Sequence, residues 1–331
     1  MINVIQLGMG PLGIKMTQFI RERSGIRTVA AVDPDPQKVG RDIGGMGNMG
    51  TYGVAVEATL EAALQKAITA PQVALITTVS DMARITPQIE ACVAAGLSVV
   101  STCEELFYPW DMASALAERI DRLAREHGAA VVGTGVNPGF LMDTLPAQLT
   151  AVSQQVEAIE VHRVQDASQR RIPFQQKIGA GLSPEAFAAK KADGSLRHVG
   201  LTESIQFIAR ALGWTLDKTE DLIEPVILEE ERHFSDVMVP KGYAAGVLQT
   251  GNGYVGDEVK IKLVFRAAVG EPESYDEIIV RGTPNLRSRI EGGVNGDVAT
   301  CAISVNACRT ILTATPGLHT MASLPMVSHF R

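Results

Sequence analysis

The first residues with a recognisable chemistry are three glycines near the amino terminus. They form the pattern Gly8-x-Gly10-x-x-Gly13, directly after the apolar run of residues 2–7. At this spacing the first glycine permits a tight turn, the second lets the backbone approach a pyrophosphate, and the third lets a helix pack close to the strand. The amides at the start of that helix then point at the phosphates. The residues that we expect to contact the phosphates are Gly8, Gly10, Pro11, Leu12 and Gly13.

The sequence around these glycines strengthens a pattern that is weak by itself. An amphipathic segment follows at residues 12–23, and a second apolar strand at residues 28–32 ends in Asp33. Asp33 lies about twenty residues past the last glycine, where an acidic side chain accepts hydrogen bonds from a ribose diol. This context favours a bound dinucleotide, NAD or NADP, over a glycine-rich turn without a ligand.

Asp33 also bears on the choice between the two cofactors. Its charge would repel the 2′-phosphate of NADP, whereas a free ribose diol donates hydrogen bonds to it. Lys38 and Arg41 follow closely in the sequence, and their positive charges lessen the repulsion of the 2′-phosphate. We therefore expect a preference for NAD and not an exclusion of NADP.

Alternating strands and helices predict the scaffold that positions these residues. Apolar runs alternate with helical segments up to residue 134, which gives about six parallel strands, a Rossmann-type doubly wound α/β sheet. The expected helices cover residues 12–23, 60–67, 83–95 and 111–127, the last with Asp111 as its N-cap. In such a sheet, ligands bind at the carboxyl ends of the strands.

Polar residues follow the strands at that edge. The expected cofactor contacts are Thr77, Thr78, Thr102 and Asn137, and Glu104 follows the strand of residues 98–101. Asn137 and Phe140 belong to the loop of residues 135–140, where an amide contact to the nicotinamide ribose and an aromatic pocket wall are expected. A turn asparagine and a hinge-packing phenylalanine are the alternatives.

The pattern changes after residue 140 and indicates a second domain. A helix over residues 141–151 leads into it, and alternating strands near residues 156–164, 247–250, 258–266, 277–280 and 286–290 predict a mixed sheet. Asp297 is expected to cap a last helix, residues 298–312, that returns to the first domain. We therefore expect a Rossmann domain of residues 1–140 completed by 297–331, and an α+β domain of residues 141–296 for substrate binding and dimerisation.

Composition excludes several classes of protein. The chain has 331 residues, and single cores stop growing at about 250–300 residues, so two domains are the default. A net charge of −7 without a basic block argues against nucleic acid as a partner. No apolar stretch approaches the ~20 residues of a membrane span, and no signal peptide precedes the first strand. We expect a cytoplasmic protein that acts on small molecules.

The four cysteines do not have the spacing of a metal site. Cys92, Cys103, Cys301 and Cys308 show no CxxC pattern and no paired histidines, so we expect no zinc and no other metal. Buried reduced thiols are the expected state. Cys103 precedes Glu104, but no histidine lies near it in the sequence to activate a nucleophile.

Several stretches together resemble one family. They are the first domain, residues 101–106 (Ser-Thr-Cys-Glu-Glu-Leu), residues 135–140 (Gly-Val-Asn-Pro-Gly-Phe), residues 197–204, and residues 296–300 with 305–307. Over nearly its full length the chain resembles the 2,4-diaminopentanoate dehydrogenases and related native amine dehydrogenases, which share the fold of dihydrodipicolinate reductase. The resemblance implies a homodimer and reversible NAD(P)-linked deamination of an amine or diamino acid to a ketone and ammonia.

The resemblance also assigns the catalytic residue. In that family the acid/base is a glutamate in the motif that matches residues 102–105, which points to Glu104. A carboxylate there can hold ammonia or an amine, stabilise the cationic iminium formed by hydride transfer, and take a proton from the attacking water. An ion pair with a surface base is the alternative for Glu104. Glu105 is expected to be its structural neighbour.

The expected substrate pocket draws on both domains. Arg163, Arg170 and Arg171 are candidates to bind a substrate carboxylate through paired hydrogen bonds, and an exposed loop or an interface salt bridge is their alternative. His198, near a helix start, is either a pocket residue or a hydrogen-bonded structural one. The pocket residues that we expect are Phe140, Leu141, Arg163, Arg171, His198 and Thr300.

Two other functions remain open. Dihydrodipicolinate reductases carry a His-His-x-x-Lys-x-Asp-x-Pro-Ser-Gly-Thr signature, whereas residues 162–171 here read His-Arg-Val-Gln-Asp-Ala-Ser-Gln-Arg-Arg. This departure argues against that reductase but leaves the fold and another C=N reductase open. The other alternative is a non-catalytic NAD(P) sensor, against which Glu104 in a matching motif speaks.

Overall fold

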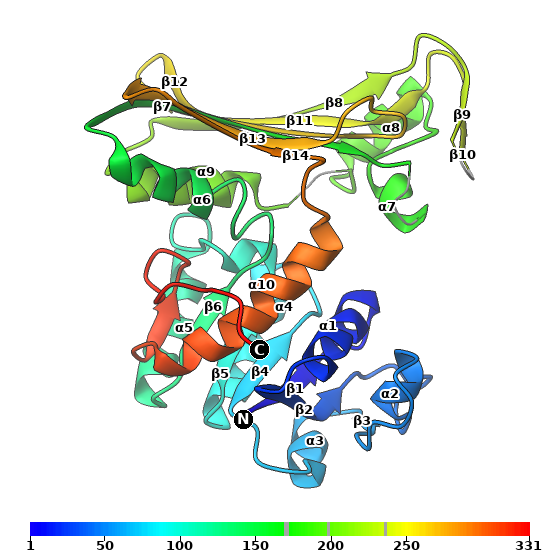
Figure 1. Cartoon of the computed structure of the whole chain (residues 1–331), viewed down its shortest axis with the longest axis vertical. Coiled ribbons are helices and arrows are strands. Elements are labelled where there is room, and N and C mark those ends of the chain that lie inside the picture. Colours follow the sequence, from blue (N-terminus) through cyan, green and yellow to red (C-terminus); the bar gives the residue numbers. More distant parts are fainter. Residues whose placement is uncertain (169–171, 197–198, 235–236) are drawn as a thin grey trace. The chain divides into compact units, whose positions relative to one another are not determined.

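The computed structural model describes residues 1–168, 172–196, 199–234 and 237–331 (Figure 1). The chain divides into two compact units. Unit 1 consists of residues 1–140 and 295–331, and unit 2 of residues 141–294.

Unit 1 contains a parallel sheet of seven strands, in the order β15-β6-β5-β4-β1-β2-β3. The change of direction at β1 and β4 is that of a doubly wound sheet, so the predicted fold class is confirmed. Six of its strands were expected, and the seventh, β15, was not. The strands are β1 (Ile2–Leu7), β2 (Ile26–Val32), β3 (Val56–Glu57), β4 (Val73–Ile76), β5 (Ser98–Ser101), β6 (Ala130–Gly133) and β15 (Gly317–His319).

Helices cover both faces of this sheet. Side chains of α3, α4 and α5 form one core with alternate residues of the central strands, including Ile5, Ile76 and Val99. On the other face α10 contacts β1, β4 and β5 and packs beside α1. The helices are α1 (Pro11–Arg21), α2 (Ile43–Met46), α3 (Leu60–Lys66), α4 (Met82–Ala94), η1 (Glu104–Leu106), α5 (Ser114–Glu126), α10 (Gly296–Thr310) and η3 (Ile311–Thr313).

Unit 2 contains the expected mixed sheet, six strands in the order β14-β13-β7-β12-β11-β8. Helices α6 and α9 lie against one of its faces (Figure 1). The strands are β7 (Gln155–Asp166), β8 (Lys218–Ile227), β11 (Ala244–Val255), β12 (Glu258–Ala268), β13 (Tyr275–Thr283) and β14 (Leu286–Glu291), with a separate hairpin of β9 (Arg232–Phe234) and β10 (Val237–Val239). The helices are α6 (Thr144–Leu149), η2 (Thr150–Val152), α7 (Ile172–Lys177), α8 (Pro184–Ala192) and α9 (Leu201–Ala211).

Two predicted helix caps are wrong. Asp111 does not cap α5, because the Ala113 amide bonds to the Pro109 carbonyl and encloses Asp111 in a separate turn before the helix. Asp297 does not cap α10, because the side chain of Asn295 accepts the hydrogen bond of the Val298 amide and leaves Asp297 in the first turn. Both helices nevertheless lie where the sequence placed them.

Two other differences concern neighbouring segments. The helix expected over residues 141–151 begins only at Thr144, where the Asp143 side chain accepts the amide hydrogen bond. The alternation of apolar and polar residues in β12 predicts an antiparallel strand, but β12 pairs antiparallel only with β11 and parallel with β7.

Among the helices of the described residues, none combines the length and apolar character that crossing a membrane requires.

Candidate active site

The strand register brings the predicted site residues to one edge of the unit 1 sheet. Leu7 pairs with Ile76, Ile76 with Ser101, and Ser101 with Gly133. The loops that follow these four residues therefore leave the sheet at the same level. They carry the glycine turn, Thr77 and Thr78, Thr102 and Glu104, and the loop of residues 135–140.

The glycine turn has the close packing that its sequence predicts. Gly8 has a φ of +90°, and a Cβ atom there would lie 2.8 Å from the Thr77 carbonyl oxygen. A Cβ atom on Gly13 would lie 1.9 Å from the Gly8 carbonyl oxygen, so only glycine lets α1 approach β1 this closely. Gly10, by contrast, faces open space, with nothing within 4 Å of a Cβ atom. The backbone at Gly10, ahead of Pro11 and Leu12, is thus accessible to a phosphate group.

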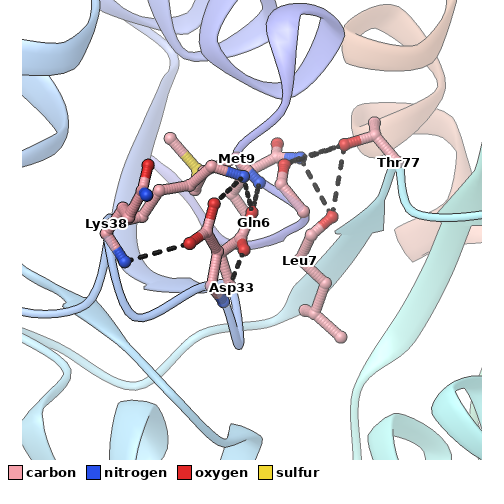
Figure 2. A network of polar contacts seen from close by, with 9 residues as sticks. Gln6, Leu7, Met9, Asp33, Lys38 and Thr77 are labelled. Atoms are coloured by element: carbon pink, nitrogen blue, oxygen red, sulfur yellow. Dashed lines mark hydrogen bonds and ion pairs between the residues drawn. The ribbon is translucent and has the colours of Figure 1, made fainter.

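Asp33 lies at the centre of a hydrogen-bonded network at the end of β2 (Figure 2). Its Oδ2 accepts hydrogen bonds from the Met9 amide and the Lys38 ammonium, both at 2.8 Å, and its Oδ1 accepts one from the Asp35 amide at 3.0 Å. Burial opposes ionisation of this carboxyl, but the hydrogen bonds from Lys38, Asp35 and Met9 outweigh burial and hold its pKa below the ordinary value. Asp33 is therefore a charged group fixed in place before any ligand arrives.

The hydroxyls of Thr77 and Thr78 both bond to protein groups. Thr77 Oγ1 lies 2.9 Å from the Gly8 carbonyl oxygen, and Thr78 Oγ1 donates to Gln88 Oε1 at 2.8 Å. Sequence reasoning placed both among the cofactor contacts, and the structure directs the Thr77 hydroxyl at the turn itself. It also adds Gln6, whose amide nitrogen lies 3.0 Å from Thr77 Oγ1. We treated Gln6 only as a strand residue, although a polar amide inside an apolar strand was a visible signal.

The two glutamates after β5 differ sharply. Glu105 Oε2 accepts the hydrogen bond of the Met82 amide at 2.8 Å and so caps the start of α4. Glu104 is half-buried, and its carboxylate has no hydrogen-bond or ion-pair partner within the described part of the chain. Thr102, also half-buried, precedes it at the end of the strand. The Glu104 carboxylate is thus available to a substrate, whereas the Glu105 carboxylate has a structural role at the start of α4.

Thr300 of α10 braces the loop of residues 135–140. Its Oγ1 accepts the hydrogen bond of the Val136 amide at 3.2 Å. The loop is tight, since the Asn137–Pro138 peptide is cis and a Cβ atom on Gly139 would lie 2.1 Å from the Gly135 carbonyl oxygen. Asn137 is buried and Phe140 is half-buried. Thr300 therefore shapes the loop that carries these two predicted site residues.

The cysteines are all reduced and buried, as expected. Burial, with a smaller contribution from the nearby Glu104 and Glu105, raises the pKa of the Cys103 thiol to about 12. A thiol with this pKa is protonated at neutral pH and is a poor nucleophile.

The predicted pocket residues of unit 2 are only partly described. Arg163 is buried and forms an ion pair with Asp276, with Nη1 and Oδ1 3.1 Å apart, and its Nη2 donates to the Val294 carbonyl at 2.9 Å. This buried ion pair within the chain is neither an exposed loop nor an interface salt bridge, and a contact of Arg163 with a substrate carboxylate stays a prediction. Leu141 is buried. Arg170, Arg171 and His198 lie outside the described residues.

Comparisons of the sequence give a consistent picture. The family model of the 2,4-diaminopentanoate dehydrogenase C-terminal domain matches residues 140–330, and the model of a CoA-binding domain matches residues 1–103. The chain is 32% identical to 2,4-diaminopentanoate dehydrogenase from Acetoanaerobium sticklandii, over 98% of this chain and 94% of that protein.

Solved structures share the fold. An amine dehydrogenase from Mycobacterium smegmatis superimposes with a TM-score of 0.85 at 21% identity, over 99% of this chain and 97% of that one. A dihydrodipicolinate reductase from Paenisporosarcina, solved with bound dipicolinate, reaches a TM-score of 0.50 at 14% identity, over 97% of both chains. The expected likeness to the dihydrodipicolinate reductase fold is confirmed.

Proposed function

This chain belongs to the 2,4-diaminopentanoate dehydrogenase family of oxidoreductases, which act on amines, and on that premise we propose that it catalyses reversible NAD(P)-linked deamination of an amine or diamino acid. The products of the oxidative direction are a ketone and ammonia. The observation that supports the proposal most is the Glu104 carboxylate at the carboxyl edge of the sheet, which has no partner among the described residues. A sensor without chemistry has no need to hold a carboxylate there without a partner.

The residues at the edge fit a nicotinamide dinucleotide. The open space at Gly10 suits a pyrophosphate approaching the backbone and the start of α1, and the Asp33 carboxylate suits the adenosine ribose. When bound, the nicotinamide accepts the hydride from the carbon that carries the amine. The protein must supply the rest of the reaction.

Glu104 supplies the charge and the proton transfers. Its carboxylate stabilises the cationic iminium that the substrate becomes when it loses the hydride. Glu104 then takes a proton from the water that attacks the iminium carbon, and it gives that proton to the nitrogen of the carbinolamine. As the C–N bond breaks and ammonia leaves, the carboxylate takes the proton of the hydroxyl group, which becomes the ketone oxygen. In the direction of reductive amination the same carboxylate holds ammonia and takes up its proton.

We further propose that NAD is preferred and NADP is accepted. The negative charge of Asp33 favours the free ribose diol. Lys38, however, lies 2.8 Å from Asp33 Oδ2 and offsets that charge, which lessens the repulsion of a 2′-phosphate. Steady-state kinetics with both cofactors test this, and a clear advantage of NADP would contradict it.

Unit 2 is proposed to bind the substrate and to form a homodimer through its sheet. Leu222 of β8 is 50% exposed and pairs with Thr250 of β11. The next residue, Gly251, faces Leu201 and Ile205 of α9, so Leu222 and Thr250 lie on the opposite face of the sheet. Light scattering on the parent chain and on Leu222→Glu tests the dimer. A monomeric parent would contradict it.

A spectrophotometric screen tests the function. Amines and diamino acids are offered with NAD or NADP. Amino acids with the same oxidised cofactors, and cyclic imines with NADH or NADPH, serve as comparison substrates. Amine-dependent formation of the reduced cofactor is the expected result. Turnover of cyclic imines alone would establish the C=N reductase instead, and cofactor binding without turnover of any substrate would indicate the sensor.

A further inference from the structure

We propose that Gln6 and Thr77 position the pyrophosphate-binding turn by holding the carbonyl group of Gly8. Neither side chain needs to touch the cofactor for this role, so both are positioning residues. The inference rests on the proposed NAD(P) cofactor and extends it to residues beyond the glycine pattern.

The burial of Gln6 is costly for stability alone. Gln6 is the second-last residue of the apolar strand β1 and is 0% exposed. Its Oε1 has no hydrogen-bond partner among the described residues. A buried polar atom without a partner destabilises a fold, and an apolar side chain of similar volume would avoid this cost. The reason for an amide at this position therefore lies in what its nitrogen contacts.

That nitrogen begins a short chain of hydrogen bonds that ends at the turn. Gln6 Nε2 lies 3.0 Å from Thr77 Oγ1 and 3.3 Å from the Gly8 carbonyl oxygen. Thr77 Oγ1 in turn lies 2.9 Å from the same carbonyl oxygen. The Gln6 amide nitrogen can only donate, so Thr77 accepts from Gln6. The single proton of the Thr77 hydroxyl then points to the Gly8 carbonyl oxygen at 2.9 Å, with the Leu7 carbonyl oxygen as a more distant acceptor at 3.2 Å. Figure 2 shows the two side chains meeting beside the turn.

The other side of the same peptide group is held by Asp33. The amide of Met9 belongs to the planar unit that contains the Gly8 carbonyl, and it donates to Asp33 Oδ2 at 2.8 Å. One peptide group is thus held at its oxygen by the side chains of Gln6 in β1 and of Thr77 just after β4, and at its nitrogen by Asp33. With both ends fixed, the backbone that leads to Gly10 has its orientation set before a pyrophosphate arrives.

A turn that is ordered in advance binds its ligand more tightly, because the ordering costs no free energy at the moment of binding. The role of Gln6 and Thr77 should therefore appear in cofactor affinity and not in the rate of the chemical step. It should also be confined to ligands that carry the pyrophosphate.

Two nearly isosteric variants test the proposal, with a matched control. Gln6→Met and Thr77→Val each remove one hydrogen-bonding group and keep the volume. Thr28→Val is the control, because Thr28 is also fully buried in a strand of this sheet and its hydroxyl has no partner among the described residues. Dissociation constants are measured for NADH, for ADP-ribose, and for adenosine, which lacks the pyrophosphate. Unfolding temperature, KM for the cofactor and kcat are measured alongside.

Each test variant should raise the dissociation constants of NADH and ADP-ribose by about 3- to 10-fold, which corresponds to the free energy of one net hydrogen bond. Adenosine affinity and kcat at saturating cofactor should stay at the parent value, and the unfolding temperature of Gln6→Met should not fall. The double variant should lose little more affinity for NADH and ADP-ribose than either single variant, since the two side chains act through one chain of hydrogen bonds. Thr28→Val should match the parent throughout.

Three results would overturn the proposal. They are NADH affinities of both test variants within twofold of the Thr28→Val control, a loss shared equally by adenosine, or a parent chain that binds no NADH at all. A parent that binds NADH but turns over no amine would refute the proposed function alone, and the affinities of the variants would still decide the role of Gln6 and Thr77.

Discussion

Two carboxylates at the same edge of the unit 1 sheet have opposite surroundings. Asp33, at the end of β2, accepts hydrogen bonds from two backbone amides and from the Lys38 ammonium. Glu104, after β5, has no partner for its carboxylate within the described residues. Hydrogen bonds within the protein thus hold the Asp33 carboxylate in place, whereas the Glu104 carboxylate is left for a substrate to contact.

This difference fits the two tasks of a dehydrogenase. A binding group gains affinity when the protein orders it in advance, because the ligand then finds it in place. A group that transfers protons must instead be able to accept a proton and face a charge that exists only during the reaction. The contrast supports the proposal that Asp33 binds the cofactor and that Glu104 takes part in the chemistry.

The largest expected effect is that of Glu104→Gln. This variant keeps the volume and a hydrogen-bonding oxygen but removes the charge and the base. Amine turnover should fall by roughly 10² to 10⁴, the range of a lost general acid–base group. Cofactor affinity should barely change, since the glycine turn and Asp33 bind a remote part of the dinucleotide. Kinetics together with NADH titrations check both statements.

Asp33→Asn should weaken cofactor binding and leave the chemical step nearly unchanged. The variant loses a charge-assisted hydrogen bond to the ribose, about 1.5–3 kcal/mol, so the KM for NAD should rise roughly 10- to 100-fold with kcat nearly unchanged. Because the pKa of Asp33 is held below its ordinary value, the charge is present throughout the neutral range and is lost only as the pH falls through that lowered pKa. Above pH ~5 the cofactor affinity of the parent should therefore show no inflection from Asp33. An unchanged KM for NAD would contradict a role of Asp33 in cofactor binding.

Lys38→Met should sharpen the preference for NAD. Removing the ammonium leaves the Asp33 charge unbalanced, which repels the 2′-phosphate, and frees Oδ2 to accept from a ribose hydroxyl. The ratio of kcat/KM for NAD to that for NADP should rise by about fivefold, which corresponds to ~1 kcal/mol. A shift of this ratio toward NADP would contradict the role given to Lys38.

The smallest effect is expected at Cys103. Burial raises the pKa of its thiol to about 12, so the thiolate is absent at neutral pH. Cys103→Ala should leave amine turnover within about twofold of the parent, and iodoacetamide should not inactivate the native protein. A rapid loss of activity on alkylation of Cys103 would reopen a nucleophilic mechanism.

The sequence was sufficient for features that depend on local pattern. The glycine spacing, the apolar runs and the helix ends predicted the doubly wound sheet and the edge where Glu104 and Asp33 lie. It was insufficient where contacts are made between distant segments. Nothing in the local sequence shows that Glu105 would cap α4, that Thr300 would support the loop of residues 135–140, or that Arg163 would pair with Asp276.

Strand β8 shows a different limit. Its residues, Lys-Thr-Glu-Asp-Leu-Ile-Glu-Pro-Val-Ile, are rich in charge and contain Pro225, so no strand was expected there. β8 is an edge strand, which tolerates both charge and proline because one side needs no partner. Whether a strand lies at an edge is a property of the whole sheet and cannot be read from the strand itself.

The most direct test is a single-turnover measurement of the chemical step. Parent, Glu104→Gln and Glu105→Gln proteins are saturated with NAD and mixed rapidly with the amine, and the absorbance of the reduced cofactor is followed. Saturation removes cofactor affinity from the comparison, and Glu105→Gln, which keeps an oxygen to accept from the Met82 amide, is the matched control. The appearance of the reduced cofactor reports hydride transfer, in which the Glu104 carboxylate stabilises the iminium. The rate should therefore fall by roughly 10² to 10³ in Glu104→Gln and stay near the parent value in Glu105→Gln. A Glu104→Gln protein that reduces the cofactor at the parent rate would remove this carboxylate from the mechanism.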